Sequence, residues 1–221
     1  ISVTGVQTCA LPISRRRDLQ GIVDWRRQEL DRLGVTVKLN TFVEAHDLAD
    51  AGFDVVIVAT GGVPDASHVP GSHVAIDGWD VMSGIKRLSG SVLVYDDHGG
   101  NQALDIAEAA VRAGCSVEVV TPERNLSPDV GGLIFWQYVK SLTEAGVRFT
   151  PARQIVDIRK DDGAFVVTLG FEDSTFSEDR RVDAVVIEAG TVANCDLYNE
   201  LVPLSSNGGE VTLEDRKSTR L

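Results

Sequence analysis

The sequence predicts an α/β fold made of two nested Rossmann-like dinucleotide-binding folds, in which the inner fold is inserted into an incomplete outer one. A run of β-branched residues, Val55–Val58, leads almost directly into Gly61 and Gly62. Asp183–Gly190 repeats that order of an aspartate, an apolar run and small residues. A complete strand–helix–strand pattern lies between the two runs. The pattern alone also allows two unrelated buried strands, each ending in a glycine turn.

The elements of the outer fold follow from the spacing of apolar residues and from glycines. Apolar residues recur at helical spacing over Leu19–Leu33, which predicts a helix. A strand is predicted over Val35–Leu39 and a short helix near Asp47–Ala51. The unbroken apolar run within Asp54–Thr60 predicts a strand buried on both faces, as in a parallel sheet. The Gly-, Pro- and His-rich stretch Gly61–Gly78 is predicted to be a loop.

The inner fold begins with a buried-strand pattern over Ser91–Tyr95. A helix is predicted over Gln102–Ala113, and Cys115–Val120 is the next strand, which completes a unit of the length expected for strand–helix–strand. A second helix over Leu133–Ala145 and a strand over Val147–Phe149 continue the alternation.

The last part of the inner fold changes to an antiparallel pattern. Residues in Gln154–Phe176 alternate in polarity around the turn Asp161–Ala164, which predicts β-hairpins. The charged run Glu172–Arg181 is interpreted as the exposed end of a hairpin. Three tryptophans lie among apolar neighbours and are interpreted as packing residues: Trp25, Trp79 and Trp136.

The composition limits the classes of partner. The chain has 21 basic and 33 acidic residues, a formal net charge of −12, so it lacks the basic surface of a nucleic-acid-binding protein and would be repelled by anionic membranes. No apolar run reaches the roughly 18 residues of a membrane helix. Cys115 and Cys195 lack CxxC or metal-ligand spacing, which favours a reducing, cytoplasmic setting. The sequence allows an oligomer.

The two ends of the chain resemble translated sequencing-library adapters and are set aside. The string SVTGVQTCALPIS lies within residues 1–14, and DRKSTRL occupies residues 215–221. We therefore expect residues 15–214 to be genuine and to be an internal piece of a longer protein.

Four stretches carry a resemblance to a known family. Ala59–Pro64 reads ATGGVP and is followed by Val69–Gly71, which reads VPG; this resembles the linker of flavoprotein oxidoreductases with two dinucleotide folds. GIVDW at Gly21–Trp25 and VYDDHG at Val94–Gly99 resemble a subgroup of the NADH:flavin oxidoreductases, in which this region is fused to an old-yellow-enzyme-like barrel. That subgroup is the trimethylamine dehydrogenase, 2,4-dienoyl-CoA reductase and N-methylproline demethylase type.

The resemblance implies a domain order and a set of cofactors. Residues 15–89 would be part of an FAD-binding domain, 90–191 an inserted NAD(P)- or ADP-binding-like domain, and 192–214 the return to the FAD domain. FMN and an iron–sulfur cluster are expected only in a part N-terminal to this sequence. The chemistry implied is hydride or electron transfer between cofactors, so no catalytic residue and no metal ligand is predicted here.

Small residues at the ends of two predicted strands are the candidate contacts with the flavin nucleotide. Without bulky side chains, the backbone admits a flat cofactor and its amides are free to donate hydrogen bonds. A tight strand-to-loop turn is the alternative explanation. The residue-by-residue match assigns Ala59, Thr60, Gly61 and Gly62, and the repeated pattern adds Ala189 and Gly190.

The inner fold departs from the glycine-rich loop that holds a pyrophosphate. The loop should read GxGxxG, but the match places His98 at the first glycine, Gly100 at the second and Ala103 at the third, with Gly99 beside them. The two carboxylates of Asp96–Asp97 would oppose a pyrophosphate electrostatically. This predicts weak NAD(P)H binding, or a pocket kept for ADP or for architecture alone.

The end of the second inner strand bears on the choice of nucleotide. An acidic residue there favours the ribose 2′-hydroxyl of NAD, but Thr121 occupies that position. Arg124 is within reach of a 2′-phosphate, which favours NADP slightly, whereas Glu123 would repel one.

The sequence therefore predicts part of a flavin-dependent oxidoreductase that binds FAD and a nicotinamide or adenine nucleotide. The resemblance implies a substrate that is an N-methylated amine or an unsaturated carbonyl compound. Two alternatives stay open: a non-catalytic module that binds ADP, and an enzyme similar to the disulfide reductases. Isolated histidines, His46, His68 and His73, are interpreted as solvated.

Overall fold

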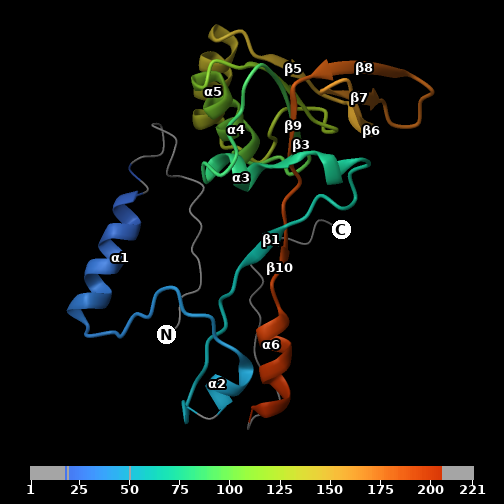
Figure 1. The fold of residues 1–221 in the computed structure, drawn as a ribbon. Coiled ribbons are helices and arrows are strands. Elements are labelled where there is room, and N and C mark those ends of the chain that lie inside the picture. The colour runs from blue at the N-terminus through green and yellow to red at the C-terminus, as the bar shows by residue number, and fades with distance from the viewer. Residues whose placement is uncertain (1–17, 19, 50, 206–221) are drawn as a thin grey trace. The chain divides into compact units, whose positions relative to one another are not determined.

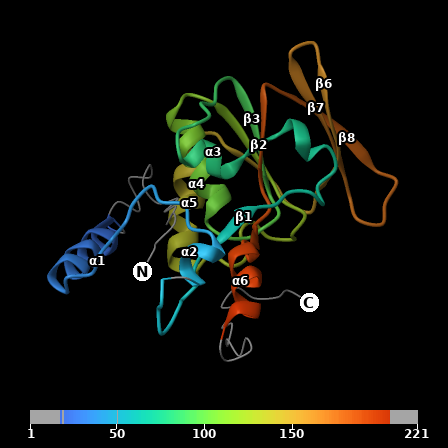
Figure 2. The same cartoon turned by 60° about the horizontal axis from the view of Figure 1, so that its bottom comes forward.

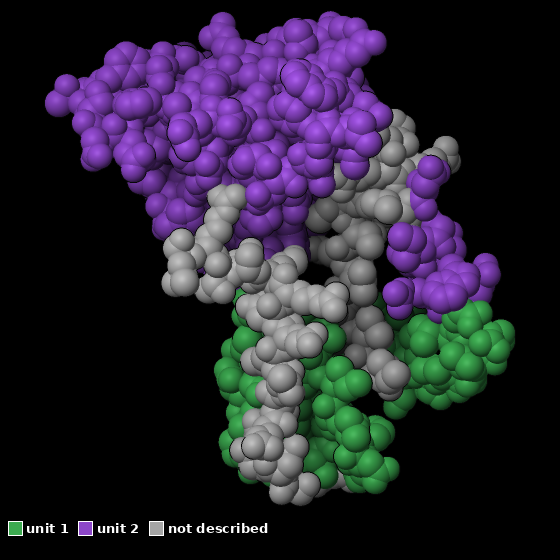
Figure 3. Space-filling view, turned by 180° about the vertical axis from the view of Figure 1, so that it is seen from behind, with its two compact units in different colours: residues 1–6, 29–62, 193–221 green, residues 7–28, 63–192 purple. Residues whose placement is uncertain are grey.

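The computed structural model describes residues 18, 20–49 and 51–205, so both adapter-like ends lie outside the described residues. The chain divides into two compact units, coloured separately in Figure 3. Among the described residues, unit 1 comprises 29–49, 51–62 and 193–205, and unit 2 comprises 18, 20–28 and 63–192. Helix α1 (Gln20–Arg32) confirms the first predicted helix. One of the boundaries between the two units falls within this helix.

Unit 2 is built on a parallel sheet of five strands in the order β2-β9-β3-β4-β5. The α/β class with a Rossmann-like parallel sheet is therefore confirmed. The strands are β2 (Ile76–Asp77), β3 (Ser91–Asp96), β4 (Ser116–Val120), β5 (Arg148–Thr150) and β9 (Ala184–Glu188). The helices between them are α3 (Gly78–Met82), α4 (Gln102–Arg112) and α5 (Gly132–Glu144).

A second, antiparallel sheet of unit 2 contains β6 (Gln154–Asp161), β7 (Ala164–Gly170) and β8 (Ser177–Val182). The predicted turn between Asp161 and Ala164 is confirmed, because these two residues pair at the end of the β6–β7 ladder. The interpretation of Glu172–Arg181 as a hairpin end is wrong for its second half. Ser177–Arg181 belongs to β8 and pairs with β7 along its length. The run reads as exposed in sequence because alternate side chains of β8 are exposed.

Alternation of side chains along β3 explains why this strand reads as continuously apolar. Val92 and Val94 pack with apolar residues of α3, α4 and α5, whereas Leu93 and Tyr95 pack with the antiparallel sheet on the other face. Figure 1 shows α4 and α5 on one side of β3 and β9, and Figure 2 shows β6, β7 and β8 on the opposite side. All four side chains are buried, so the prediction of a buried strand at Ser91–Tyr95 is confirmed.

Unit 1 differs from the prediction at both of its expected strands. It contains helix α2 (Ala45–Ala49), helix α6 (Asp196–Leu201) and the 3-10 helix η3 (Val202–Leu204). Neither Val35–Leu39 nor Asp54–Thr60 is a strand, and Val55 and Ile57 are 76% and 78% exposed. An extended segment becomes a strand only when another strand bonds to its backbone, and no strand among the described residues lies beside either segment.

Two short strands mark the places where the chain passes between the units: β1 (Gly62–Pro64) and β10 (Thr191–Ala193), which pair with each other. The predicted loop Gly61–Gly78 therefore contains β1, the 3-10 helix η2 (Ser72–Val74) and β2. Because β2 pairs with β9 and α3 packs on α4, residues 63–89 lie in the same compact unit as 90–191.

Two of the three tryptophans are not packing residues. Trp25 is 58% exposed and Trp136 is 68% exposed, whereas Trp79 is partly buried in α3. Apolar neighbours in sequence therefore gave the wrong interpretation for Trp25 and Trp136, because both lie on outward faces of their helices. Across residues 20–49 and 51–205, no helix combines the length and hydrophobicity needed to cross a bilayer.

We expect Arg180→Met to lower the free energy of unfolding by about 1–3 kcal/mol, because it breaks a partly buried charged network. The Arg180 Nε donates to both carboxylate oxygens of Glu118 at 3.2 and 3.1 Å, and its Nη1 donates to Glu178 at 2.9 Å. Arg180 and Glu118 are only 20% and 12% exposed. The network links β8 of the antiparallel sheet to β4 of the parallel sheet.

Arg181→Met is the matched control, since Arg181 lies next to Arg180 on β8 and pairs with Asp161 in a half-exposed ion pair. Such a pair contributes roughly 0–1 kcal/mol. Urea unfolding of both variants measures the difference, and equal losses of stability would contradict the role given to burial.

Candidate functional site

The segment Thr60–Gly62 is hydrogen-bonded to Asn194, and its backbone at Gly61 is exposed. The Thr60 hydroxyl donates to the Asn194 carbonyl at 2.5 Å, and the Asn194 amide donates to the Gly61 carbonyl at 2.9 Å. Gly61 has φ of +71°, a conformation that residues with a Cβ rarely adopt. Among the residues that the structure describes, none beyond its chain neighbours has an atom within 4 Å of the position that a Cβ would take. The predicted site therefore offers bare, exposed backbone at Gly61, although Asp54–Thr60 before it is not a strand.

The loop between β3 and α4 of unit 2 is organised by the buried carboxylate of Asp96. Asp96 accepts hydrogen bonds from the amides of His98 and Gly99, at 3.3 and 2.8 Å, and from the Ser127 hydroxyl at 3.0 Å. Its exposed fraction is 0%. Burial raises the pKa of Asp96 above its usual range, and the hydrogen bonds from Gly99, Ser127 and His98 oppose that rise. The Asp96 carboxylate therefore binds backbone amides of the β3–α4 loop, in which a dinucleotide fold would offer amides to a phosphate.

The second carboxylate of this loop, Asp97, has a different partner. Its Oδ2 lies 2.6 Å from the His68 Nε2, so His68, which is 55% exposed as its interpretation as solvated predicts, does not stand alone but pairs with Asp97. The ring of His98 covers Gly190, with the Nδ1 atom 3.1 Å from the position of a Cβ on that glycine. Unlike Gly61, Gly190 is therefore already covered by a side chain.

Side chains also fill the space around Gly100, the predicted pyrophosphate-binding glycine, and Ala103 in α4 is buried. A Cβ on Gly100 would meet the Gln102 Oε1 atom, and the His98 Cδ2 atom at 3.2 Å. Ala103 is fully buried in the cluster between α4 and the sheet, which matches the packing role of the third glycine in a dinucleotide loop.

The β4–α5 connection lies directly against the β3–α4 loop. The Asp129 amide donates to the Gly99 carbonyl at 3.0 Å, in addition to the bond between Ser127 and Asp96. Thr121 is fully buried and its hydroxyl accepts from the Glu123 amide at 3.2 Å, whereas Arg124 is exposed. Ser127 could not be identified as part of this site from the sequence, because it lies 31 residues from Asp96 in the chain.

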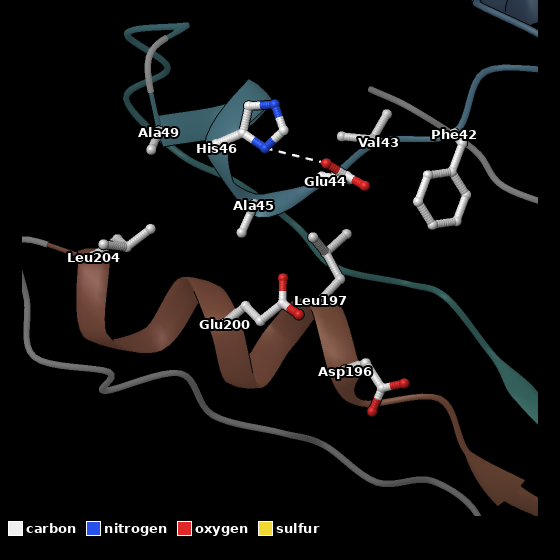
Figure 4. Close-up of a pocket in the computed structure, with 10 residues that line it drawn as sticks. All are labelled: Phe42, Val43, Glu44, Ala45, His46, Ala49, Asp196, Leu197, Glu200 and Leu204. Atoms are coloured by element: carbon white, nitrogen blue, oxygen red, sulfur yellow. Dashed lines mark ion pairs between the residues drawn. The ribbon is translucent and has the colours of Figure 1, made fainter.

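A hollow of about 630 Å³ lies within unit 1, between α2 and α6 (Figure 4). Apolar residues including Ala45, Leu197 and Leu204 line it together with the acidic residues Glu44, Asp196 and Glu200. His46 contacts Glu44 at 3.2 Å and is 71% exposed. Among the described residues, no group of three or more His, Cys, Asp or Glu could hold a metal ion.

Comparisons with known proteins identify relatives of the whole region. The profile of the family "Pyridine nucleotide-disulphide oxidoreductase" matches residues 21–219. The chain is 36% identical over 198 residues to a probable N-methylproline demethylase of Rhizobium meliloti, covering 89% of this chain and 29% of that protein. It is 31% identical over 220 residues to an N,N-dimethylglycine/sarcosine dehydrogenase of Chromohalobacter salexigens, covering 96% and 32%.

A solved structure supports the same relationship. The 6-hydroxypseudooxynicotine amine oxidase of Pseudomonas geniculata N1 superposes with a TM-score of 0.79 at 27% identity, over 90% of this chain and 31% of that one. The chain thus spans about a third of the length of the relatives that it matches. The individual cofactor contacts stay predictions. The match over residues 21–219 shows that the chain belongs to the pyridine nucleotide-disulphide oxidoreductase family.

Proposed function

We propose that the chain is the nucleotide-binding part of a larger, cytoplasmic flavin-dependent oxidoreductase, in which unit 1 contributes to an FAD site. The observation that carries this proposal is the backbone at Gly61, whose Cβ position has no atom of the other described residues within 4 Å beyond its chain neighbours. A flat, phosphate-bearing cofactor can lie directly against such a backbone. FAD, when bound, supplies the transfer of a hydride or of electrons.

Exposed apolar residues of unit 1 support the view that more polypeptide completes this site. Val55 and Ile57 are exposed although they belong to an apolar run, and Phe42 is 84% exposed. Such side chains are normally covered in a finished domain. The chain also spans only 29% to 32% of the two curated relatives, which leaves room for a barrel with FMN and an iron–sulfur cluster elsewhere.

The substrate class that we propose is a small N-methylated amine, since the two relatives named above act on N-methylproline and on dimethylglycine or sarcosine. The reaction would be oxidation of the N-methyl group outside this chain, with electrons passed on through the flavin. Reduction of an unsaturated carbonyl compound is the alternative within the same family resemblance.

A second candidate function concerns unit 2 alone. The occupied loop at Asp96, Gly100 and Gly190 favours a unit that is kept for architecture and does not bind NAD(P)H. In that case the enzyme would deliver its electrons to a carrier other than a nicotinamide nucleotide.

The test is purification of the full-length protein followed by anaerobic titration. We expect bound FAD after denaturation, and bleaching of the flavin absorbance by N-methylproline, sarcosine or dimethylglycine. Bleaching by NADPH or NADH, with no response to amines, would favour the reductase alternative. A full-length protein that carries no flavin when expressed with excess riboflavin would overturn the proposal.

A further inference from the structure

We propose that Asp96 excludes the pyrophosphate of a dinucleotide from unit 2, because its own carboxylate binds the backbone amides of the β3–α4 loop. The inference rests on the proposed function, in which unit 2 has the fold of a nucleotide-binding insert. It adds the residue that decides whether this insert takes a nucleotide.

The first step is that Asp96 accepts hydrogen bonds from backbone amides of the β3–α4 loop. In a dinucleotide-binding fold, the loop after the first strand offers its backbone N–H groups to the phosphates at the start of the helix. Here the amides of His98 and Gly99 donate to Asp96, at 3.3 and 2.8 Å. A phosphate oxygen would have to displace a carboxylate that is already bound and fully buried.

The second step concerns the β4–α5 connection, which is hydrogen-bonded to the β3–α4 loop. Ser127 donates to Asp96, and the Asp129 amide donates to the Gly99 carbonyl at 3.0 Å. Gly99 is therefore fixed through both its amide and its carbonyl, the latter by the β4–α5 connection. The adenosine part of a dinucleotide normally passes between these two connections, at the carboxyl edge of the sheet.

The third step is the space and charge around the loop. The Gln102 side-chain oxygen Oε1 lies close to the position that a Cβ of Gly100 would take, and the His98 ring lies over Gly190. Asp96 is in register with Glu188 on the adjacent strand β9, and Glu188 is only 5% exposed. Two acidic residues at neighbouring strand ends add to the electrostatic opposition to a pyrophosphate.

The experiment uses the full-length protein with its flavin bound, so that the FAD site is filled. Calorimetric titration with NADH, NADPH and ADP is expected to show only weak binding to the wild type, with dissociation constants in the millimolar range that serve as the reference for the variants. Asp96→Ala frees two amides and removes one charge, so we expect the affinity for ADP to rise by at least about tenfold.

Asp97→Ala is the matched control. It removes the same charge from the next residue, but the Asp97 carboxylate faces His68. We expect a rise of less than about threefold, since the Asp97 carboxylate pairs with His68 and its removal frees neither of the two amides that Asp96 binds. Equal gains from Asp96→Ala and Asp97→Ala would overturn the proposal, because general charge and not capture of the amides would then explain the exclusion.

A measurement on the wild type keeps the proposal testable if Asp96→Ala does not fold. Hydrogen–deuterium exchange of a peptide that covers residues 96–103 should be unchanged by NADH, NADPH or ADP. Protection of that peptide by any of the three would show that the loop takes a nucleotide, and the proposal would fail. Flavin content is measured separately, so loss of the proposed function and loss of this inference give different results.

Discussion

Replacing Gly61 by valine is expected to reduce the FAD content of the purified full-length protein by at least about tenfold, because the substitution covers the backbone on which the cofactor would lie. Apart from its chain neighbours, no described residue has an atom within 4 Å of the Cβ position of Gly61, so the new side chain would occupy space that is open in the described part of the chain and that the proposal assigns to the cofactor. The measurement is the ratio of flavin to protein absorbance, with FAD identified after release by heat.

Backbone strain must be separated from loss of the ligand, because Gly61 has φ of +71° and valine is strained in that region. Gly52→Val provides the control, because Gly52 has φ of +67° and lies in the same unit. Its Cβ position also has no atom of the described residues within 4 Å beyond its chain neighbours. We expect both variants to lose similar stability and only Gly61→Val to lose FAD. Full flavin content in Gly61→Val, or equal flavin loss in Gly52→Val, would refute the contact at Gly61.

The fold of unit 2 was predictable because the groups that satisfy its strands lie within the same stretch of chain. The apolar run at Ser91–Tyr95 reads as buried on both faces, and the helices and the antiparallel sheet that bury it are all encoded before Gly190. The run Val55–Ile57 has the same appearance in sequence. Its strand did not form because no described strand offers backbone groups to it. Local pattern therefore predicts a strand only where its neighbours are also present.

The nucleotide loop shows a similar limit. The sequence identified Asp96 and Asp97 as an obstacle to pyrophosphate, because like charges so close to a phosphate are unfavourable. It did not reveal that one carboxylate binds the loop and the other pairs with His68. Those partners depend on how loops distant in sequence meet at the sheet edge. The negative charges of Asp96 and Asp97 could be predicted from the sequence, whereas the groups that bind their carboxylates became known only from the structure.

Gly71→Ala is expected to lower the free energy of unfolding by about 2–5 kcal/mol, since it combines backbone strain with a clash in the core. Gly71 has φ of +76°, and an added Cβ would lie 2.7 Å from the Ile158 amide nitrogen and 2.8 Å from its carbonyl oxygen. Ile158 is 3% exposed in β6, so relief would require the backbone of that strand to move. This contact gives a packing reason for the glycine in Val69–Gly71, the stretch that resembles the family linker.

Gly163→Ala isolates the two contributions within the same sheet. Gly163 has φ of +78° in the turn between β6 and β7, and in the described part of the chain no atom beyond its chain neighbours lies within 4 Å of its Cβ position. It should therefore lose only the strain of the left-handed conformation, about 1–2 kcal/mol. Chemical denaturation of both variants gives the difference, which we attribute to the contact with Ile158. If the two losses are equal, the close approach at Gly71 does not constrain the sequence, and only its φ does.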